Sequence, residues 1–155
     1  MTAAAAGLLW WPHHSAASAR ARPGEAANVI GRPQPVGKVH LVAFLATQPD
    51  TAATPSRSQA VEITSLLAQY GAKGLTAEIV DESGATTNAL TNTYYDWQLG
   101  DIHLTGDPGR TRAGQFKVTG APTTLLVDDK GTVLARWDSY VLTAQAAQII
   151  TVKLS

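Results

Sequence analysis

The stretch that decides the fold runs from Asp107 to Trp137 and reads DPGRTRAGQFKVTGAPTTLLVDDKGTVLARW. It holds two apolar runs, Thr123–Asp128 and Thr132–Trp137, joined by DDKG. Asp and Gly form tight turns, so the pattern predicts two antiparallel strands in a hairpin. Ahead of the hairpin, Arg110–Phe116 is predicted to form a short helical turn.

Upstream, the pattern predicts two parallel strands around a helix. Val39–Ala46 is apolar at both alternating sets of positions, as in a strand covered on both faces, and Gly74–Asp81 is the next strand. Pro55–Tyr70 between them has one apolar stripe, formed by Ile63, Leu66, Leu67 and Tyr70. We expect Thr54 to be the N-cap, Pro55 the first helical residue and Gly71 the stop. Such a unit is right-handed.

Three further elements complete the predicted order. Thr86–Trp97 is expected to be a helix, although its Thr and Asn residues have weak helix propensity, and Ile102–Leu104 a short strand. Thr143–Val152 is predicted to close the chain as a helix that packs on the sheet through Ala147, Ile150 and Leu154.

Four segments are similar to thioredoxin-superfamily redoxins, which include peroxiredoxins, alkyl hydroperoxide reductases and membrane-anchored thiol-disulfide oxidoreductases. These segments are GKVHLVAFLAT (37–47), the helix that follows it, GLTAEIVD (74–81) and the 107–137 stretch. The resemblance implies an α/β fold, a thioredoxin-like three-layer α/β/α arrangement with a central mixed sheet. It also implies that TGAPTT (119–124) is the cis-proline loop that faces the active-site dithiol in the family.

The chain departs from the family where the chemistry should be, because its 155 residues include no cysteine. The segment TQPDTAATPSRSQ (47–59) replaces the Cys-x-x-Cys turn. A helix N-terminus can bring a thiol into its thiolate form near neutral pH, but a serine hydroxyl starts many pKa units higher. Ser56 is therefore not expected to replace the nucleophile, and Thr54, Ser56 and Ser58 are expected to be capping and solvent-facing residues. No catalytic residue is predicted.

Binding can persist without sulfur. In the family, the residue before the cis-proline exposes backbone groups that pair with an extended peptide. The resemblance places Ala121, Pro122 and Thr123 in that role. The face around them predicts a ligand or peptide site that also includes Thr47, Gln48, Ser56, Arg57 and Asp81. An equal alternative to binding is that the loop is retained only because the fold needs it.

Other chemistry is weakly indicated. A metal site could in principle use His40 and His103 with Asp81, Glu82 or Asp107. These histidines are far apart in the sequence and do not form a closely spaced ligand pair, so neither a metal nor another cofactor is expected. A formal net charge of zero and a pI near 6.9 disfavour nucleic acid and anionic membranes as partners. No integral membrane span is expected.

The sequence divides into an N-terminal arm, residues 1–36, and a thioredoxin-like domain, residues 37–155. The arm's short apolar run and small residues hint at a remnant signal or anchor, but no basic segment precedes the run. Trp10 and Trp11 could instead pack on the domain or join two copies in a homodimer. An exported and a cytoplasmic location stay equally open.

We therefore predict a redox-inactive binding module for a protein, peptide or small molecule, in effect a pseudoenzyme. The first alternative is a family-type oxidoreductase or antioxidant that uses a non-thiol or partner-supplied group. The second alternative is a structural subunit assembled through the arm.

Overall fold

The computed structural model describes residues 29–30, 36–140 and 143–155. The hypotheses on Trp10 and Trp11, on a signal and on dimerisation through the arm lie outside these residues. The division at residue 36 also stays a prediction. It is notable, however, that Val29–Ile30 (β1), which we assigned to the arm, pairs antiparallel with the sheet strand β4, His103–Gly106.

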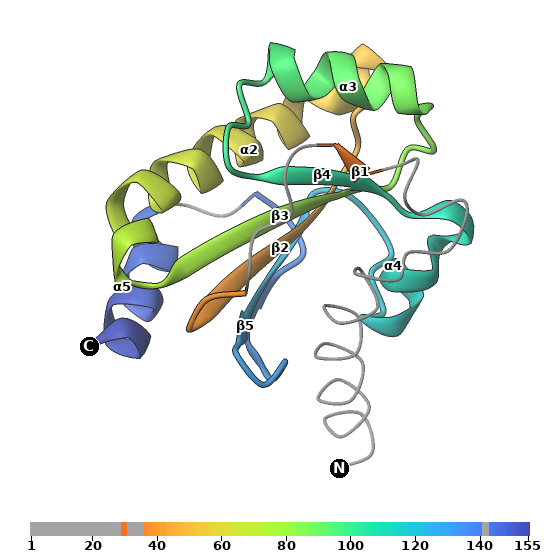
Figure 1. Ribbon diagram of the computed structural model, residues 1–155. Helices are drawn as coiled ribbons and strands as arrows, with labels where there is room; N and C mark the ends of the chain where they lie inside the picture. Colours follow the sequence, from red (N-terminus) through yellow and green to blue (C-terminus); the bar gives the residue numbers. More distant parts are fainter. Residues whose placement is uncertain (1–28, 31–35, 141–142) are drawn as a thin grey trace.

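A six-stranded mixed sheet forms the centre of the fold, in the order β1-β4-β3-β2-β5-β6 (Figure 1). The strands β2, β3 and β4 are parallel, and β5 and β6 continue the sheet antiparallel. The remaining strands are β2 Val39–Leu45, β3 Leu75–Asp81, β5 Thr123–Asp128 and β6 Val133–Trp137. The predicted parallel pair and hairpin are confirmed.

Helices cover both faces of the sheet, which gives three layers (Figure 1). They are α2 Asp50–Tyr70, η3 Gly71–Lys73, α3 Thr87–Asp96, η4 Pro108–Arg110, α4 Thr111–Gln115 and α5 Thr143–Leu154. The larger core joins one face to α2, α3 and α5, and the smaller core joins the other face to α4. Strand β2 is buried throughout because both layers cover it, as its continuous apolar run predicted.

The start of α2 differs from the prediction. The helix begins at Asp50 with Pro49 as N-cap, and Pro55 lies inside it. The Ala53 N–H already donates to the Pro49 carbonyl at 2.9 Å, so helical geometry is established before the proline. Proline disfavours a helix interior because it lacks an N–H. Here the surrounding turns are held by the burial of Ser56, Gln59 and Ala60 against the sheet.

The predicted apolar stripe of α2 is confirmed. Ile63 and Leu66 are fully buried, Tyr70 is buried, and Leu67 packs at the margin of the larger core. At the C-terminus, Ile150 is buried as expected, Ala147 and Leu154 are only partly buried, and Ala146 is fully buried. Thr86 caps α3 by accepting from the Ala89 N–H at 3.2 Å.

Candidate functional site

The predicted site residues converge on one edge of the sheet. Leu45 pairs with Asp81 in the parallel β2–β3 register, and Phe44 pairs with Thr123 in the antiparallel β2–β5 register. The carboxyl ends of β2 and β3 therefore meet the start of β5. Open α/β sheets place their functional loops at this kind of edge.

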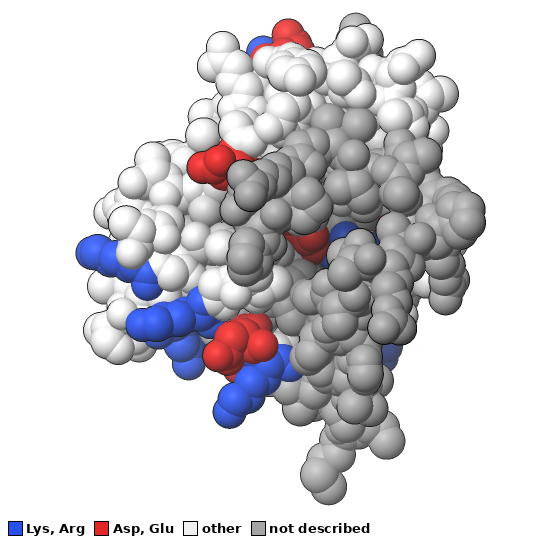
Figure 2. Space-filling view, in the orientation of Figure 1, with Lys and Arg blue, Asp and Glu red and all other residues white. Residues whose placement is uncertain are grey.

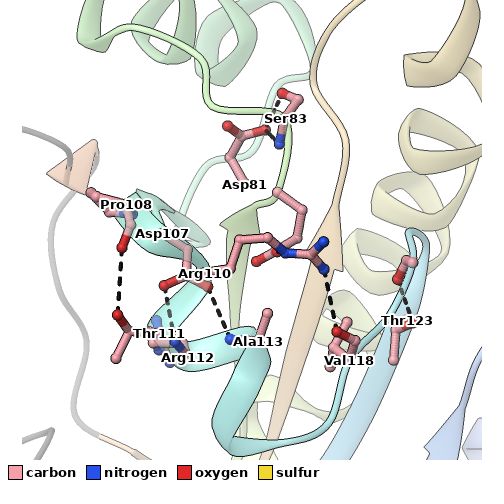
Figure 3. Close-up of polar contacts among 12 residues, drawn as sticks. Asp81, Ser83, Asp107, Pro108, Arg110, Thr111, Arg112, Ala113, Val118 and Thr123 are labelled. Carbon is pink, nitrogen blue, oxygen red and sulfur yellow. Dashed lines mark hydrogen bonds and ion pairs between the residues drawn. The ribbon is translucent and has the colours of Figure 1, made fainter.

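At this edge Asp81 is a buried acceptor for its neighbours. Its Oδ1 accepts from the Thr47 hydroxyl at 2.8 Å and N–H at 3.2 Å, and from the Ser83 hydroxyl at 2.6 Å. Its Oδ2 accepts from the Ala85 N–H at 2.9 Å. The Asp81–Ser83 contact is visible in Figure 3. Both oxygens are thus engaged, so Asp81 and Thr47 shape the edge rather than offer themselves to a ligand.

Ser56 corrects the sequence interpretation, which placed it facing solvent. Its side chain is fully buried, and its Oγ accepts from the Ala46 N–H at 2.8 Å. The interior position follows from the early start of α2, which turns Ser56 toward the end of β2. The hydroxyl satisfies a backbone donor just beyond the strand, where the ladder between β2 and β5 has stopped.

The remaining predicted residues provide the accessible surface. Gln48, Arg57 and Ala121 are exposed and Pro122 is half-buried, whereas Thr123 is buried and donates to the Gly120 carbonyl at 2.7 Å. The peptide bonds before Pro49 and before Pro122 are cis. Within the described part of the chain, the N–H and carbonyl of Ala121 make no hydrogen bond. A backbone in this condition can pair with an added extended segment.

Two hollows adjoin this edge. One, of about 480 Å³, lies between the start of α2 and the end of α3 and is lined by Thr47, Ala53, Thr54, Arg57, Asn92, Thr93, Asp96 and Trp97. Across it, Arg57 and Asp96 form an exposed ion pair at 3.4 Å. The other, of about 340 Å³, lies between residues 81–85 and 106–110.

The second hollow contains a group that sequence reasoning passed over, Arg110. Its Nε donates to Glu82 Oε2 at 3.1 Å and its Nη2 donates to the Val118 carbonyl at 3.2 Å, a reach across the site seen in Figure 3. Burial raises the pKa of Glu82 from 4.5 to about 7, helped by the neighbouring Asp107 carboxylate, and Arg110 offsets part of the rise.

The histidines lie on the face of the sheet that α4 covers, around a carboxylate that we did not single out, Glu78. His103 Nε2 is 3.0 Å and His40 Nε2 4.0 Å from Glu78 oxygens, and Arg112 of α4 donates to the same carboxylate. Asp81, Glu82 and Asp107 are not part of this group. Across residues 29–30, 36–140 and 143–155, no cluster of three or more His, Asp or Glu has the geometry to hold a metal ion.

The pKa values of Glu78 and His40 in this buried cluster differ strongly from their ordinary values. Burial alone would raise the pKa of Glu78, but the Arg112 guanidinium and the His103 hydrogen bond outweigh it and hold that pKa well below its ordinary value. Burial lowers the pKa of His40 from 6.5 to about 4, partly offset by the Glu78 carboxylate. The pattern is that of a structural ion-pair network, which also perturbs pKa values.

On the face shown in Figure 2, the basic side chains of the described residues gather mainly at the lower left beside one acidic group, and smaller charged groups lie elsewhere. Among the helices described, none combines the length and the apolar character needed to cross a bilayer.

Comparison with known proteins identifies the fold. Protein-family models and curated protein sequences give no match. Solved structures do match. A Chlorobium tepidum protein described as a candidate thiol:disulfide interchange protein, DsbE, aligns with a TM-score of 0.63 and 21% identity, covering 78% of this chain and 83% of that one. A thioredoxin-like superfamily protein aligns with a TM-score of 0.68 and 14% identity, covering 82% and 90%.

Peroxiredoxin Q of Xanthomonas campestris aligns with a TM-score of 0.59 and 15% identity, covering 76% of this chain and 78% of that one. The chain therefore has the thioredoxin-like fold, and the predicted resemblance to redoxins is confirmed for the architecture. It has that fold without a cysteine in its 155 residues.

Sequence reasoning missed Glu78, Arg110 and Arg112, although a signal existed for one of them. Glu78 lies between the apolar residues Ala77 and Ile79 inside a strand, and a buried carboxylate needs a cationic partner. The partners could not be named, because Arg110 and Arg112 come from a separate segment and only the packing of η4 and α4 brings them to the sheet.

Proposed function

We propose that this chain is a binding module that is inactive in thiol redox chemistry, and that it takes up an extended peptide segment along the loop 120–123. The observation that carries the proposal is the Ala121 backbone. Among the described residues it has no hydrogen-bond partner, it is exposed, and it lies two residues before the start of β5, where the pairing between β2 and β5 ends. Main-chain pairing with an added strand needs only such free donors and acceptors.

Two features support the choice of a peptide over a compact ligand. Thr47 and Asp81 are already committed to each other, and Ser56 is committed to Ala46, so these polar groups do not converge on a ligand. Of the accessible groups, Gln48 and Ala121 line neither hollow, and Arg57, which lines the hollow between α2 and α3, is paired there with Asp96. A spread surface with free backbone fits an extended chain better than a small molecule.

The absence of thiol chemistry rests on composition. A disulfide reductase or a peroxidase of this fold needs a thiolate that attacks and is regenerated, and a serine hydroxyl has no corresponding oxidation states. Insulin reduction and peroxide consumption by the purified chain, each measured with dithiothreitol present, should equal the buffer rate. A turnover that persists after repurification would contradict the proposal and favour the oxidoreductase alternative.

Binding is tested with a permanently unfolded chain, reduced and carboxymethylated α-lactalbumin, titrated into the ¹⁵N-labelled protein. We expect amide shifts to concentrate at Gly120, Ala121 and Thr123. Ala121→Arg should weaken binding about tenfold or more, because a bulky side chain enters the path of the added strand. Asp129→Arg introduces the same side chain at an exposed position in the turn after β5 and should bind normally. Shifts elsewhere, or equal binding by both variants, would refute the site.

A further inference from the structure

The Arg110 side chain links the loop after β3, the start of α4 and the approach to the proline loop. Its Nε is 3.1 Å from Glu82 Oε2, and its Nη2 is 3.2 Å from the carbonyl of Val118. Val118 is buried and precedes Gly120 by two residues. A hydrogen bond that holds the Val118 carbonyl therefore restrains the backbone that leads into the loop 120–123. Figure 3 shows Arg110 spanning this gap.

The backbone conformation of Arg110 sets the direction in which its side chain leaves the chain. The residue has φ 55° and ψ 36°, in the left-handed region that non-glycine residues rarely adopt, and it follows Gly109 with φ 70°. Such a conformation persists when surrounding contacts determine it. The two hydrogen bonds of the guanidinium are contacts of this kind.

The other end of the link, Glu82, is a carboxyl group with one satisfied oxygen. Its side chain is only 5% exposed, and Oε1 is buried and accepts no hydrogen bond from any described residue. Two charged groups face it, Arg110 from η4 and Asp107 from the connection after β4. Asp107 is itself fixed, since its oxygens accept from the Arg112 N–H at 3.0 Å and the Ala113 N–H at 2.9 Å.

The two protonation states of Glu82 would make different contacts with its neighbours. When Glu82 is ionised, it forms an ion pair with Arg110, but it stands beside the Asp107 carboxylate with one oxygen lacking a donor. When Glu82 is protonated, it becomes a donor to Asp107, and Arg110 loses its counter-charge. Burial and Asp107 raise the pKa of Glu82 to about 7, so the change between the ionised and the protonated form falls near neutral pH.

We propose that Glu82 and Arg110 form a pH-sensitive strap that fixes the loop 118–123 when Glu82 is ionised and loosens it when Glu82 is protonated. The inference rests on the proposed function in one respect only: it assigns regulation to the loop that we propose as the peptide site. A fixed loop is preorganised for pairing, so peptide binding is tighter above neutral pH than below it.

The size of the effect follows from the bond that is lost. A hydrogen bond to a charged partner is worth about 1 kcal/mol more than a neutral one, which corresponds to about a fivefold change in affinity. With a pKa of about 7, Glu82 is mostly but not fully protonated at pH 6 and mostly but not fully ionised at pH 8. We therefore expect the dissociation constant for carboxymethylated α-lactalbumin to be about three times larger at pH 6 than at pH 8.

The strap is tested first without any ligand. Amide shifts of Val118, Gly120 and Ala121 are followed by NMR from pH 5.5 to 8.5, and we expect one transition with a midpoint near 7. Glu82→Gln should abolish the transition, whereas Asp129→Asn, which removes an exposed carboxylate, should preserve it.

A second variant separates titration from transmission. Arg110→Lys keeps the positive charge, but a single ammonium group cannot replace the fork that holds both Glu82 and Val118. In this variant the Glu82 side-chain carbon should still titrate, while the loop amides should no longer follow it.

The outcomes distinguish the two proposals. A loop that is insensitive to pH in the wild type, or that titrates equally in Glu82→Gln, overturns the strap even if peptide binds. A loop that titrates as expected while no peptide binds at either pH supports the strap and overturns the proposed function. Equal affinity at pH 6 and pH 8 overturns the regulatory role.

Discussion

Glu78→Gln tests whether the buried charge cluster on the α4 face stabilises the fold. The side chains of Glu78 and Arg112 are each 7% exposed, and His103 Nε2 also contacts the carboxylate at 3.0 Å. Gln has nearly the shape of Glu, so the change opens no cavity, but it removes the charge and replaces one acceptor oxygen with an NH2 donor. The Arg112 guanidinium is then left in a buried position without the charge of the Glu78 carboxylate.

Breaking a buried ion pair in this way costs about 3–5 kcal/mol, whereas an exposed pair contributes about 0–1 kcal/mol. With a urea m-value of about 2 kcal/mol/M, a loss of about 3 kcal/mol lowers the unfolding midpoint by about 1.5 M. The assay is equilibrium urea unfolding at pH 7, monitored by tryptophan fluorescence.

The matched control is Asp96→Asn, the same carboxylate-to-amide change at the exposed Arg57 pair, whose side chains are 55% and 65% exposed. We expect it to cost less than about 1 kcal/mol. A double variant, Glu78→Gln with Arg112→Met, should recover part of the loss because no uncompensated charge remains. Equal costs for Glu78→Gln and Asp96→Asn, or a double variant whose loss is the sum of the single losses, would refute the reasoning.

Three further predictions concern single buried groups. Ser56→Ala leaves the Ala46 N–H without its acceptor and should cost about 1–3 kcal/mol, whereas the exposed Ser58→Ala should be neutral in the same urea assay. Because the folded pKa of His40 is about 4 against 6.5 unfolded, stability should fall as pH drops from 6.5 to 4, by up to about 3 kcal/mol, and His40→Asn should flatten this slope. Because the folded pKa of Glu82 is about 7 against 4.5, stability should fall as pH rises through that window, and Glu82→Gln should remove that fall. The two slopes oppose each other between pH 4.5 and 6.5, so His40 is measured in the Glu82→Gln background; unchanged slopes in these variants would contradict the assignments.

Periodicity predicted most of the fold because apolar spacing reports burial directly. The largely apolar β2, the stripe of α2 and the β5–β6 hairpin follow from their own residues. The start of α2 did not, because proline is a strong local signal for a first helical turn and the packing of Ser56 and its neighbours overrides it.

The candidate site stays a prediction, and the structure adds the position and the burial of its residues. The sheet register brings Thr47, Asp81 and Thr123 to one edge, as the order of strands implied. Burial then separates the members that hold the edge together, such as Asp81 and Ser56, from those that solvent reaches, such as Ala121. A sequence pattern cannot make this distinction, because it gives the element to which a side chain belongs but not which hydrogen bonds it makes.

The sequence by itself determined the class of architecture and the absence of sulfur, because both depend only on residue identity and short-range order. Tertiary structure alone decided which polar groups are neighbours. Arg110 meets Glu82 across 28 positions, and Arg112 meets Glu78 across 34. Charges act through space, so their partners and their pKa values are set by packing between segments that the chain order keeps apart.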